Sequence, residues 1–271
     1  MIFSKIEHQL RKAILLLKPL AIFEILEYVG KLTIIVGVIT FFAESGERKK
    51  VSHYQAWSVI NSAEGKQTSG GRIDALQDLA RDKVSLAGLN AEGAFLEGVQ
   101  LKHADLQRAN FDKAKLQKAQ LRNANLSRAS LDSATLSNAN LKNSKLGGAS
   151  LIGANLSNAE LEGAEMHSSD LTNAKLIEAN LASSTLQGTT FLNALLPEAN
   201  LENATLESTD LRGARLSSAN FRNTIIFNVD LEEADLSDAD FREAQISKVN
   251  FDNTILCNTT MPDGSVRNDD C

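Results

Sequence analysis

Apolar residues recur at every fifth position through most of this 271-residue chain. The series begins at Leu86 and continues without a change of register to Met261. The residue two places before each of them is usually Ala, Ser, Thr or Val. An α-helix has a period of 3.6 residues and a flat strand a period of two, so neither keeps these positions on one face. The pattern predicts instead a coil that turns a corner every five residues, with one small and one large side chain inside.

The segment ANLSRASLDSATLSNANLKNS, residues 124–144, resembles the A(D/N)LXX motif of the pentapeptide-repeat family. The resemblance extends from Val84 to Met261. It implies a mainly β fold, a right-handed quadrilateral β-helix (a β-solenoid) with four pentapeptides per coil, preceded here by N-terminal α-helices. We expect about 35 pentapeptides in nearly nine coils, and a solenoid roughly 40 Å long, because stacked strands lie about 4.8 Å apart. Such a solenoid has no internal cavity for a substrate, which argues against an enzyme.

The implied coil places residues that are twenty apart directly above one another, so the sequence becomes a map of the surface. Residues 102–145 contain nine Lys and Arg against three Asp, a net charge of +6, whereas residues 160–243 contain five against sixteen, a net charge of −11. Two lines of basic residues form a candidate surface for an anionic partner, such as lipid headgroups or an acidic protein; the alternative is an ordinary solvated face. The surface consists of Lys102, Arg122, Lys142, Arg108 and Arg128.

Other positions on the map predict packing or contact. Phe221 and Phe241 are inward neighbours and should stack. A line of amides should form a partial ladder: Asn140, Asn180, Asn200 and Asn220. Four outward apolar residues near one corner form a candidate contact patch: Ile177, Leu192, Leu195 and Pro197.

The sequence before the repeats is hydrophobic from Ala13 to Ala43. We expect a transmembrane helix from about Leu20 to Ala43, with Glu24, Glu27 and Lys31 on one stripe and Glu27 paired with Lys31. Two alternatives are an amphipathic helix in the plane of the membrane and a buried helix of a soluble domain. The candidate membrane-anchor residues are Leu32, Ile34, Ile35, Val36, Val38, Ile39, Phe41 and Phe42. This leader resembles that of pentapeptide-repeat proteins from photosynthetic bacteria.

Four regions follow from these features: an anchor at 1–50, a helical linker and cap at 51–83, the repeats at 84–261 and a tail at 262–271. Within the linker we expect a helix around Glu47 to Ile60, a loop from Gly65 to Gly71, and a helix from Arg72 to Arg81 that caps the first coil. The tail is too short for a capping helix. Either it folds over the last coil or two chains join there, and we expect a weak homodimer through Phe251 to Met261.

Two cysteines, Cys257 and Cys271, are too few for a disulfide framework and favour a reducing compartment for the repeats. We therefore expect a single-pass membrane protein with the repeats on the cytoplasmic side. No catalytic, metal-binding or cofactor-binding constellation is visible. The sequence thus predicts a non-enzymatic, membrane-tethered scaffold with an unknown protein partner. Some members of the family imitate DNA and interact with type II topoisomerases; this is the alternative, although the +6 section disfavours it, and we expect no direct binding to nucleic acid.

Overall fold

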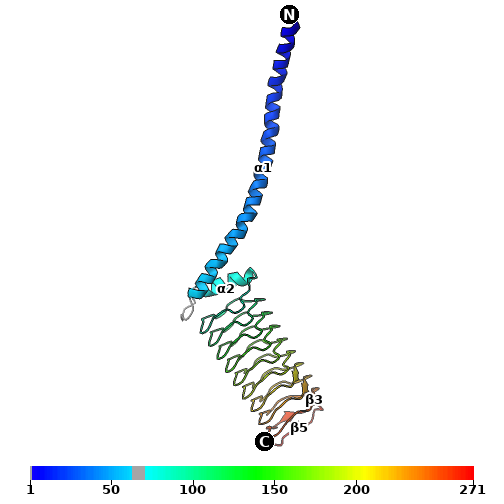
Figure 1. Cartoon of the computed structure of the whole chain (residues 1–271). Coiled ribbons are helices and arrows are strands. Elements are labelled where there is room, and N and C mark those ends of the chain that lie inside the picture. The colour runs from blue at the N-terminus through cyan, green and yellow to red at the C-terminus, as the bar shows by residue number, and fades with distance from the viewer. Residues whose placement is uncertain (1, 63–70) are drawn as a thin grey trace. The chain divides into compact units, whose positions relative to one another are not determined.

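The computed structural model describes the backbone of residues 2–62 and 71–271 (Figure 1). Side chains of residues 2–5, 14, 16–26 and 41–45 lie outside the described part. The chain divides into two compact units, Met1–Gln55 and Ala56–Cys271. The second unit contains the repeats, so the positions of the candidate sites are set by its internal geometry.

The first unit is helical. Helix α1 runs from Ile2 to Ser62 without interruption, so the separate helices expected at 20–43 and 47–60 are one helix. The charged segment between them continues the helix because Glu47 and Lys50 lie one turn apart and pair, with 2.7 Å between Oε1 and Nζ. The expected pair of Glu27 and Lys31 is also present, at 2.6 Å. Among the residues that the structure describes, no helix is both long and apolar enough to cross a membrane.

Helix α2, Arg72–Arg81, has the predicted bounds, while most of the preceding loop lies outside the described residues. Its apolar residues Leu76 and Leu79 are fully buried and belong to the core of the repeats. Arg72 is buried beside them and its guanidinium donates to the carbonyl of Ile60 in α1. The Gln77 side chain accepts a hydrogen bond of 2.9 Å from the amide of Gln100 in the first coil. Helix α2 therefore caps the coil as predicted, since it covers the core and satisfies an amide at the edge.

The repeats form a ladder in which each residue pairs in parallel with the residue twenty positions later, from Asn90 with Asn110 to Asp240 with Thr260. One coil therefore contains four pentapeptides, and Figure 1 shows the coils stacked from cyan to orange. The three longest strands have three residues each: β1 (Thr205–Glu207), β2 (Ile225–Phe227) and β3 (Gln245–Ser247). They form one parallel sheet in the order β1-β2-β3.

Each pentapeptide folds in the same way because its five positions have different tasks. The large residue donates its amide to the next coil, as Leu161 does to the carbonyl of Asn180 at 2.7 Å. The second residue after it adopts a left-handed conformation at the corner, and Asn frequently occupies this position. The small residue, for example Ala164, closes the corner by donating to Leu161. Both inward residues are buried, so every coil contributes a Leu-rich and Ala-rich layer to one core.

Two predicted stacks are confirmed. The rings of Phe221 and Phe241 lie 4.5 Å apart and nearly parallel inside the solenoid. Asn220 donates its side-chain amide to Asn200 at 3.0 Å, and Asn200 donates to Asn180 at 3.2 Å. The ladder is shorter than the predicted line because Glu160 separates Asn140 from the other amides and itself accepts from Asn180.

The tail folds over the last coil, which is the first of the two alternatives that the sequence left open. Strand β4 (Thr259–Thr260) pairs antiparallel with β5 (Val266–Arg267) in the tail. Cys257 and Cys271 are joined by a disulfide, and no cysteine is free. The edge at Leu256 to Met261 is consequently covered by chain that has no five-residue period.

Candidate functional site

The basic surface predicted from the sequence lies on two neighbouring corners of the first coils. Backbone hydrogen bonds join Lys102, Arg122 and Lys142 into one column, since the amide of His103 donates to Arg122 and that of Asn123 to Lys142. Arg108 and Arg128 lie in a second column on the next corner. All of these side chains except that of Lys142 are exposed.

Lys142 differs from the rest of its column because two carboxylates of the next coil hold it. Its ammonium lies 2.9 Å from Oε2 of Glu162 and 3.2 Å from Oε2 of Glu160. The hydrogen bond to Glu162, followed by that to Glu160, raises the pKa of Lys142 above its ordinary value. The same hydrogen bond lowers the pKa of Glu162. Lys142 thus ends the basic column, and its charge is already balanced within the protein.

Four basic side chains have no such partner. Among the side chains described in residues 2–62 and 71–271, none forms an ion pair with Lys102, Arg122, Arg108 or Arg128. Other lysines of the basic section are paired with earlier coils, Lys113 with Glu92 at 3.2 Å and Lys118 with Glu97 at 3.6 Å. The two columns therefore carry four of the positive charges of the section that are unpaired within the described residues, and the other two belong to Lys115 and Lys145, which are exposed on other columns.

A cleft of about 610 Å³ lies at the head of the Lys102 column, between the end of α2 and the first coils. Arg81, Lys83 and Lys102 contribute positive charge to it, whereas Asp105 contributes one negative charge. The Ser85 hydroxyl donates to Asp105 at 2.6 Å, and this hydrogen bond is the main cause of the lowered pKa of that carboxyl. The remaining residues that line the cleft are Ala80, Val84, Ser85, His103 and Ala104. The basic surface therefore includes a concave site, this cleft, in addition to the columns of charged side chains.

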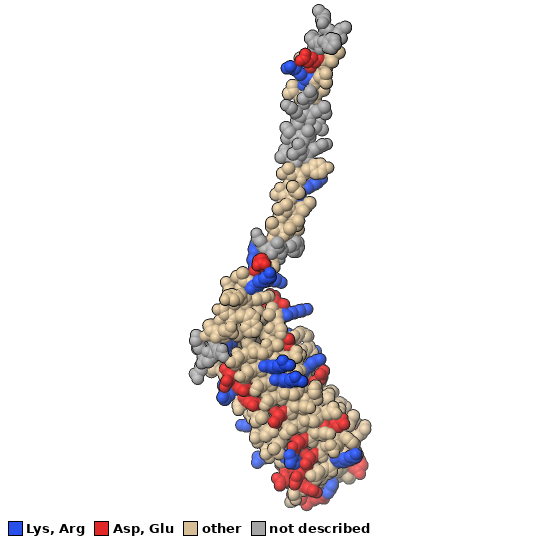
Figure 2. Space-filling view, in the orientation of Figure 1, with Lys and Arg blue, Asp and Glu red and all other residues tan. Residues whose placement is uncertain are grey.

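In the acidic section, residues 160–243, several carboxylates form ion pairs with arginines of the same section. Arg212 lies 2.8 Å from Asp210 and 3.8 Å from Asp230. Arg222 and Arg242 both contact Asp240, each at 2.6 Å. The space-filling view shows red and blue atoms mixed in the lower part of the solenoid, whereas blue atoms form bands higher up (Figure 2). The acidic surface is therefore not continuous, because arginine side chains that pair with its carboxylates interrupt it.

The predicted apolar patch is only partly assembled. Ile177 and Pro197 lie in one column, because Asn158 donates to the carbonyl of Ile177 and Glu178 to that of Pro197. Leu195 lies on the adjacent face and pairs with Lys175 and Arg215, while Leu192 lies at the preceding corner. All four side chains are half-buried, so the patch offers little apolar surface to a partner.

More exposed apolar side chains occur on β2, which the sequence analysis did not single out. Ile225 and Phe227 are 44% and 37% exposed, and the Lys248 ammonium lies 5.0 Å from the centre of the Phe227 ring. The sequence feature that could have predicted these exposed side chains is the run Ile225–Ile226–Phe227, in which two outward positions are apolar.

The candidate anchor residues have exposed side chains where they are described. Leu32, Ile34, Ile35, Val36, Val38 and Ile39 of α1 are between 49% and 67% exposed. Phe41 and Phe42 lie outside the described side chains. Within the described residues, no group of three or more His, Cys, Asp or Glu side chains is placed to hold a metal ion.

The comparison with protein families matches the model described as "Pentapeptide repeats (8 copies)". The matched residues are 82–117, 109–151, 139–176, 174–213, 184–226 and 224–261. No curated protein matches the chain in sequence.

Solved structures of the same kind are similar to parts of the chain. HetL, a pentapeptide repeat protein involved in heterocyst differentiation regulation from the cyanobacterium Nostoc sp. strain PCC 7120, is 28% identical over 71% of this chain and 97% of its own, with a TM-score of 0.47. Rfr23 from the cyanobacterium Cyanothece 51142 is 37% identical over 37% of this chain and 62% of its own, with a TM-score of 0.31. QnrB1, a plasmid-mediated fluoroquinolone resistance protein, is 17% identical over 54% and 74%, with a TM-score of 0.44.

Members of this family fold as right-handed quadrilateral β-helices, and the twenty-residue ladder agrees with four pentapeptides per coil. Since the family model spans residues 82–261, this chain belongs to the pentapeptide repeat family.

Proposed function

We propose that the protein is a non-enzymatic scaffold whose solenoid binds an anionic membrane surface through its two basic columns. One observation carries this proposal: Lys102, Arg122, Arg108 and Arg128 are exposed on neighbouring corners, and no carboxylate in the described residues pairs with them. Basic residues near an anionic leaflet contribute about 1 kcal/mol each. Four of them on two neighbouring corners give affinity for such a surface without a deep pocket.

Helix α1 supports the choice of a membrane over an acidic protein. Its exposed residues from Leu32 to Ile39 include six apolar side chains, which water solvates poorly. A lipid phase would cover them if α1 lies as an anchor in the interface. In the proposed function α1 holds the chain at the membrane and the solenoid presents its other faces to partner proteins.

Cell fractionation tests the tether. We expect the full chain in the membrane fraction and a variant that begins at Lys49 in the supernatant. A full chain that remains in the supernatant would exclude the tether, and protection of a type II topoisomerase by such a chain would favour the DNA-mimic alternative. The pairing of Asp210, Asp230 and Asp240 with arginines counts against that alternative, because it interrupts the acidic surface.

Vesicle binding tests the basic columns separately. The substitution pair K102E/R122E should weaken binding to vesicles containing anionic lipid by about thirtyfold or more, since two contributions of about 1 kcal/mol are lost and then reversed. The control pair K115E/K175E changes the net charge equally but lies on another column; Lys115 and Lys175 are also exposed. Equal weakening by both pairs would show that only net charge matters. If the first pair leaves vesicle binding intact while an acidic protein is lost, the partner is a protein.

The side of the membrane on which the solenoid lies is part of the proposal. The cytoplasmic side would keep Cys257 and Cys271 as thiols, whereas an oxidising compartment would preserve their disulfide. Alkylation of free thiols in intact cells, followed by mass spectrometry, distinguishes the two compartments.

We also propose weak self-association at the last coil. Ile246, Val249 and Phe251 are half-buried there, whereas Ile226, Val229 and Leu231 in the preceding coil are buried. The amide of Phe251 has no hydrogen-bond acceptor within the described residues. A second copy would cover both. A solenoid that stays monomeric by light scattering at high concentration would exclude this.

A further inference from the structure

In the inner coils, the backbone amides that point toward the next coil are hydrogen-bonded in one regular way. Three amides on one side of each coil donate to carbonyls nineteen residues later: Leu236 to Ile255 at 3.0 Å, Asp238 to Cys257 at 2.8 Å, and Phe241 to Thr260 at 2.8 Å. The corresponding amides in the last coil belong to Leu256, Asn258 and Met261. These three amides do not donate to carbonyls nineteen residues later.

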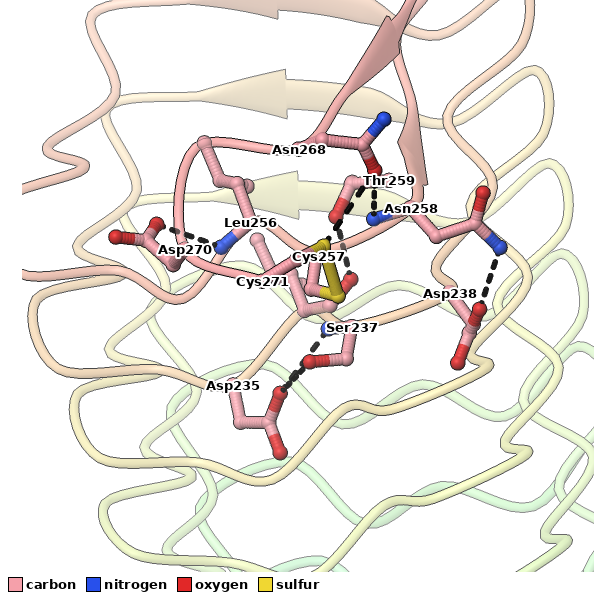
Figure 3. Close-up of a disulfide and its surroundings, with 11 residues drawn as sticks. Asp235, Ser237, Asp238, Leu256, Cys257, Asn258, Thr259, Asn268, Asp270 and Cys271 are labelled. Carbon is pink, nitrogen blue, oxygen red and sulfur yellow. Dashed lines mark hydrogen bonds between the residues drawn. A yellow bond between two sulfur atoms is a disulfide. The ribbon is translucent and has the colours of Figure 1, made fainter.

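The tail replaces the missing coil with acceptors of its own (Figure 3). The amide of Leu256 donates to the Asp270 carboxylate at 3.0 Å, and that of Asn258 to the side-chain oxygen of Asn268 at 2.8 Å. The amide of Met261 donates to the carbonyl of Ser265 at 2.7 Å. On this side of the last coil, these three amides are therefore satisfied by the tail, whereas the amide of Phe251 on another side is not satisfied within the described residues.

Hydrogen bonds, including those of the β4–β5 pair, and the disulfide hold the tail in this place, and apolar packing contributes little. Every residue from Asp263 to Cys271 is exposed, and its single large apolar side chain, Val266, is 51% exposed. Burial of apolar surface thus contributes almost nothing to its attachment. Cys257 lies between the capped residues Leu256 and Asn258, and Cys271 follows Asp270, so the disulfide fastens the tail at the edge that it covers.

We propose that the Cys257–Cys271 disulfide is a redox latch, which keeps the tail over the edge at Leu256–Met261 when oxidised and releases it when reduced. The reductant is a dithiol. Its thiolate attacks one sulfur of the disulfide, Cys271 being the exposed one, and the protein's other sulfur leaves as a thiolate. The second thiol of the reductant then resolves the mixed disulfide. Two electrons and two protons pass to the protein, which holds two thiols, while the dithiol becomes a disulfide. The released edge presents three unpaired amides, which is the property of a strand-accepting edge.

Amide hydrogen exchange of the full chain, measured by NMR in the oxidised state and after reduction with dithiothreitol, tests the latch. We expect exchange at Leu256, Asn258 and Met261 to accelerate at least tenfold on reduction. The matched amides of Leu236, Asp238 and Phe241 should keep their rates, since their acceptors lie in the last coil itself. Equal rates for Leu256, Asn258 and Met261 in the two redox states would overturn the proposal.

Two variants separate the latch from the acceptors that it holds. Cys271→Ser should exchange like reduced protein and should not respond to dithiothreitol. Asp270→Ala keeps both cysteines and removes one acceptor, so the amide of Leu256 alone should exchange faster in the oxidised state. The proposal also fails if maleimide labels both cysteines in protein that has been purified in air without reductant. If Cys271→Ser does not fold, the response of the unsubstituted chain to dithiothreitol still decides the matter.

Discussion

Residues 102–145 and residues 160–243 share one ladder and one core, yet they differ in whether their charged side chains form ion pairs. In the first section, basic side chains such as Lys102 and Arg122 stack above one another, and neither forms an ion pair within the described residues. In the second section, Arg212 lies between Asp210 and Asp230, and Arg222 pairs with Asp240. The difference teaches that the net charge of a section does not measure the charge that a partner meets. What matters is whether the opposite charge lies within reach in the neighbouring coil.

The largest expected effect tests whether the two sections share the same core. Leu121 and Leu201 are both buried, one beneath the basic columns and one in the acidic section. Each substitution to Ala should lower the free energy of unfolding by about 2–5 kcal/mol, because it leaves a cavity in a close-packed layer. Urea unfolding should show losses that agree within about 1 kcal/mol. A much smaller loss at Leu201 would mean that the acidic section unfolds independently.

A smaller effect is expected where the two sections meet. Lys142→Glu removes both pairs with Glu160 and Glu162 and places a third carboxylate beside them. Thermal unfolding should occur about 2–4 °C lower at low salt, and the difference should shrink in 1 M salt. Lys102→Glu, in the same column but without a partner, is the control and should leave the Tm unchanged. Equal shifts for the two variants would contradict the assigned pairing.

The smallest effect concerns the acidic section. The hydrogen bond from Arg212 is the first cause of the lowered pKa of Asp210, and Asp210 in turn raises the pKa of Arg212. A lowered carboxyl pKa stabilises the fold above the ordinary pKa of Asp, and this contribution is lost as the pH falls through the lowered value. Arg212→Gln should therefore reduce the Tm by less than about 2 °C at pH 7, and the difference should vanish near pH 2.

NMR titration of Asp210 gives the direct measurement for this prediction. Its pKa should rise towards the ordinary carboxyl value in Arg212→Gln, and the variant should elute later from an anion-exchange column. An unchanged pKa would show that the arginine does not hold the carboxylate in solution.

The residues that the sequence placed correctly are those governed by the repeat. Leu and Phe at every fifth position had to face inward, since no other arrangement buries them, and the stack of Phe221 on Phe241 followed. The columns followed as well, because twenty residues per coil fix which residues are neighbours. Pairs such as Lys142 with Glu160 are separated by 18 positions rather than 20, and they depend on how long side chains bend across a corner. Glu162, by contrast, lies twenty positions after Lys142 in the same column, so that pair follows from the coil length.

The sequence by itself determined the solenoid, its coil length and the cap at Arg72–Arg81, because periodic burial and local helix formation need no distant partner. Only the tertiary structure decided the fate of the tail. Residues 262–271 have no period and few apolar side chains, so nothing local specifies their path. The requirement that the amides of Leu256 and Asn258 find acceptors arises only once the coils are stacked, and it is met by Asp270 and Asn268 beside the disulfide.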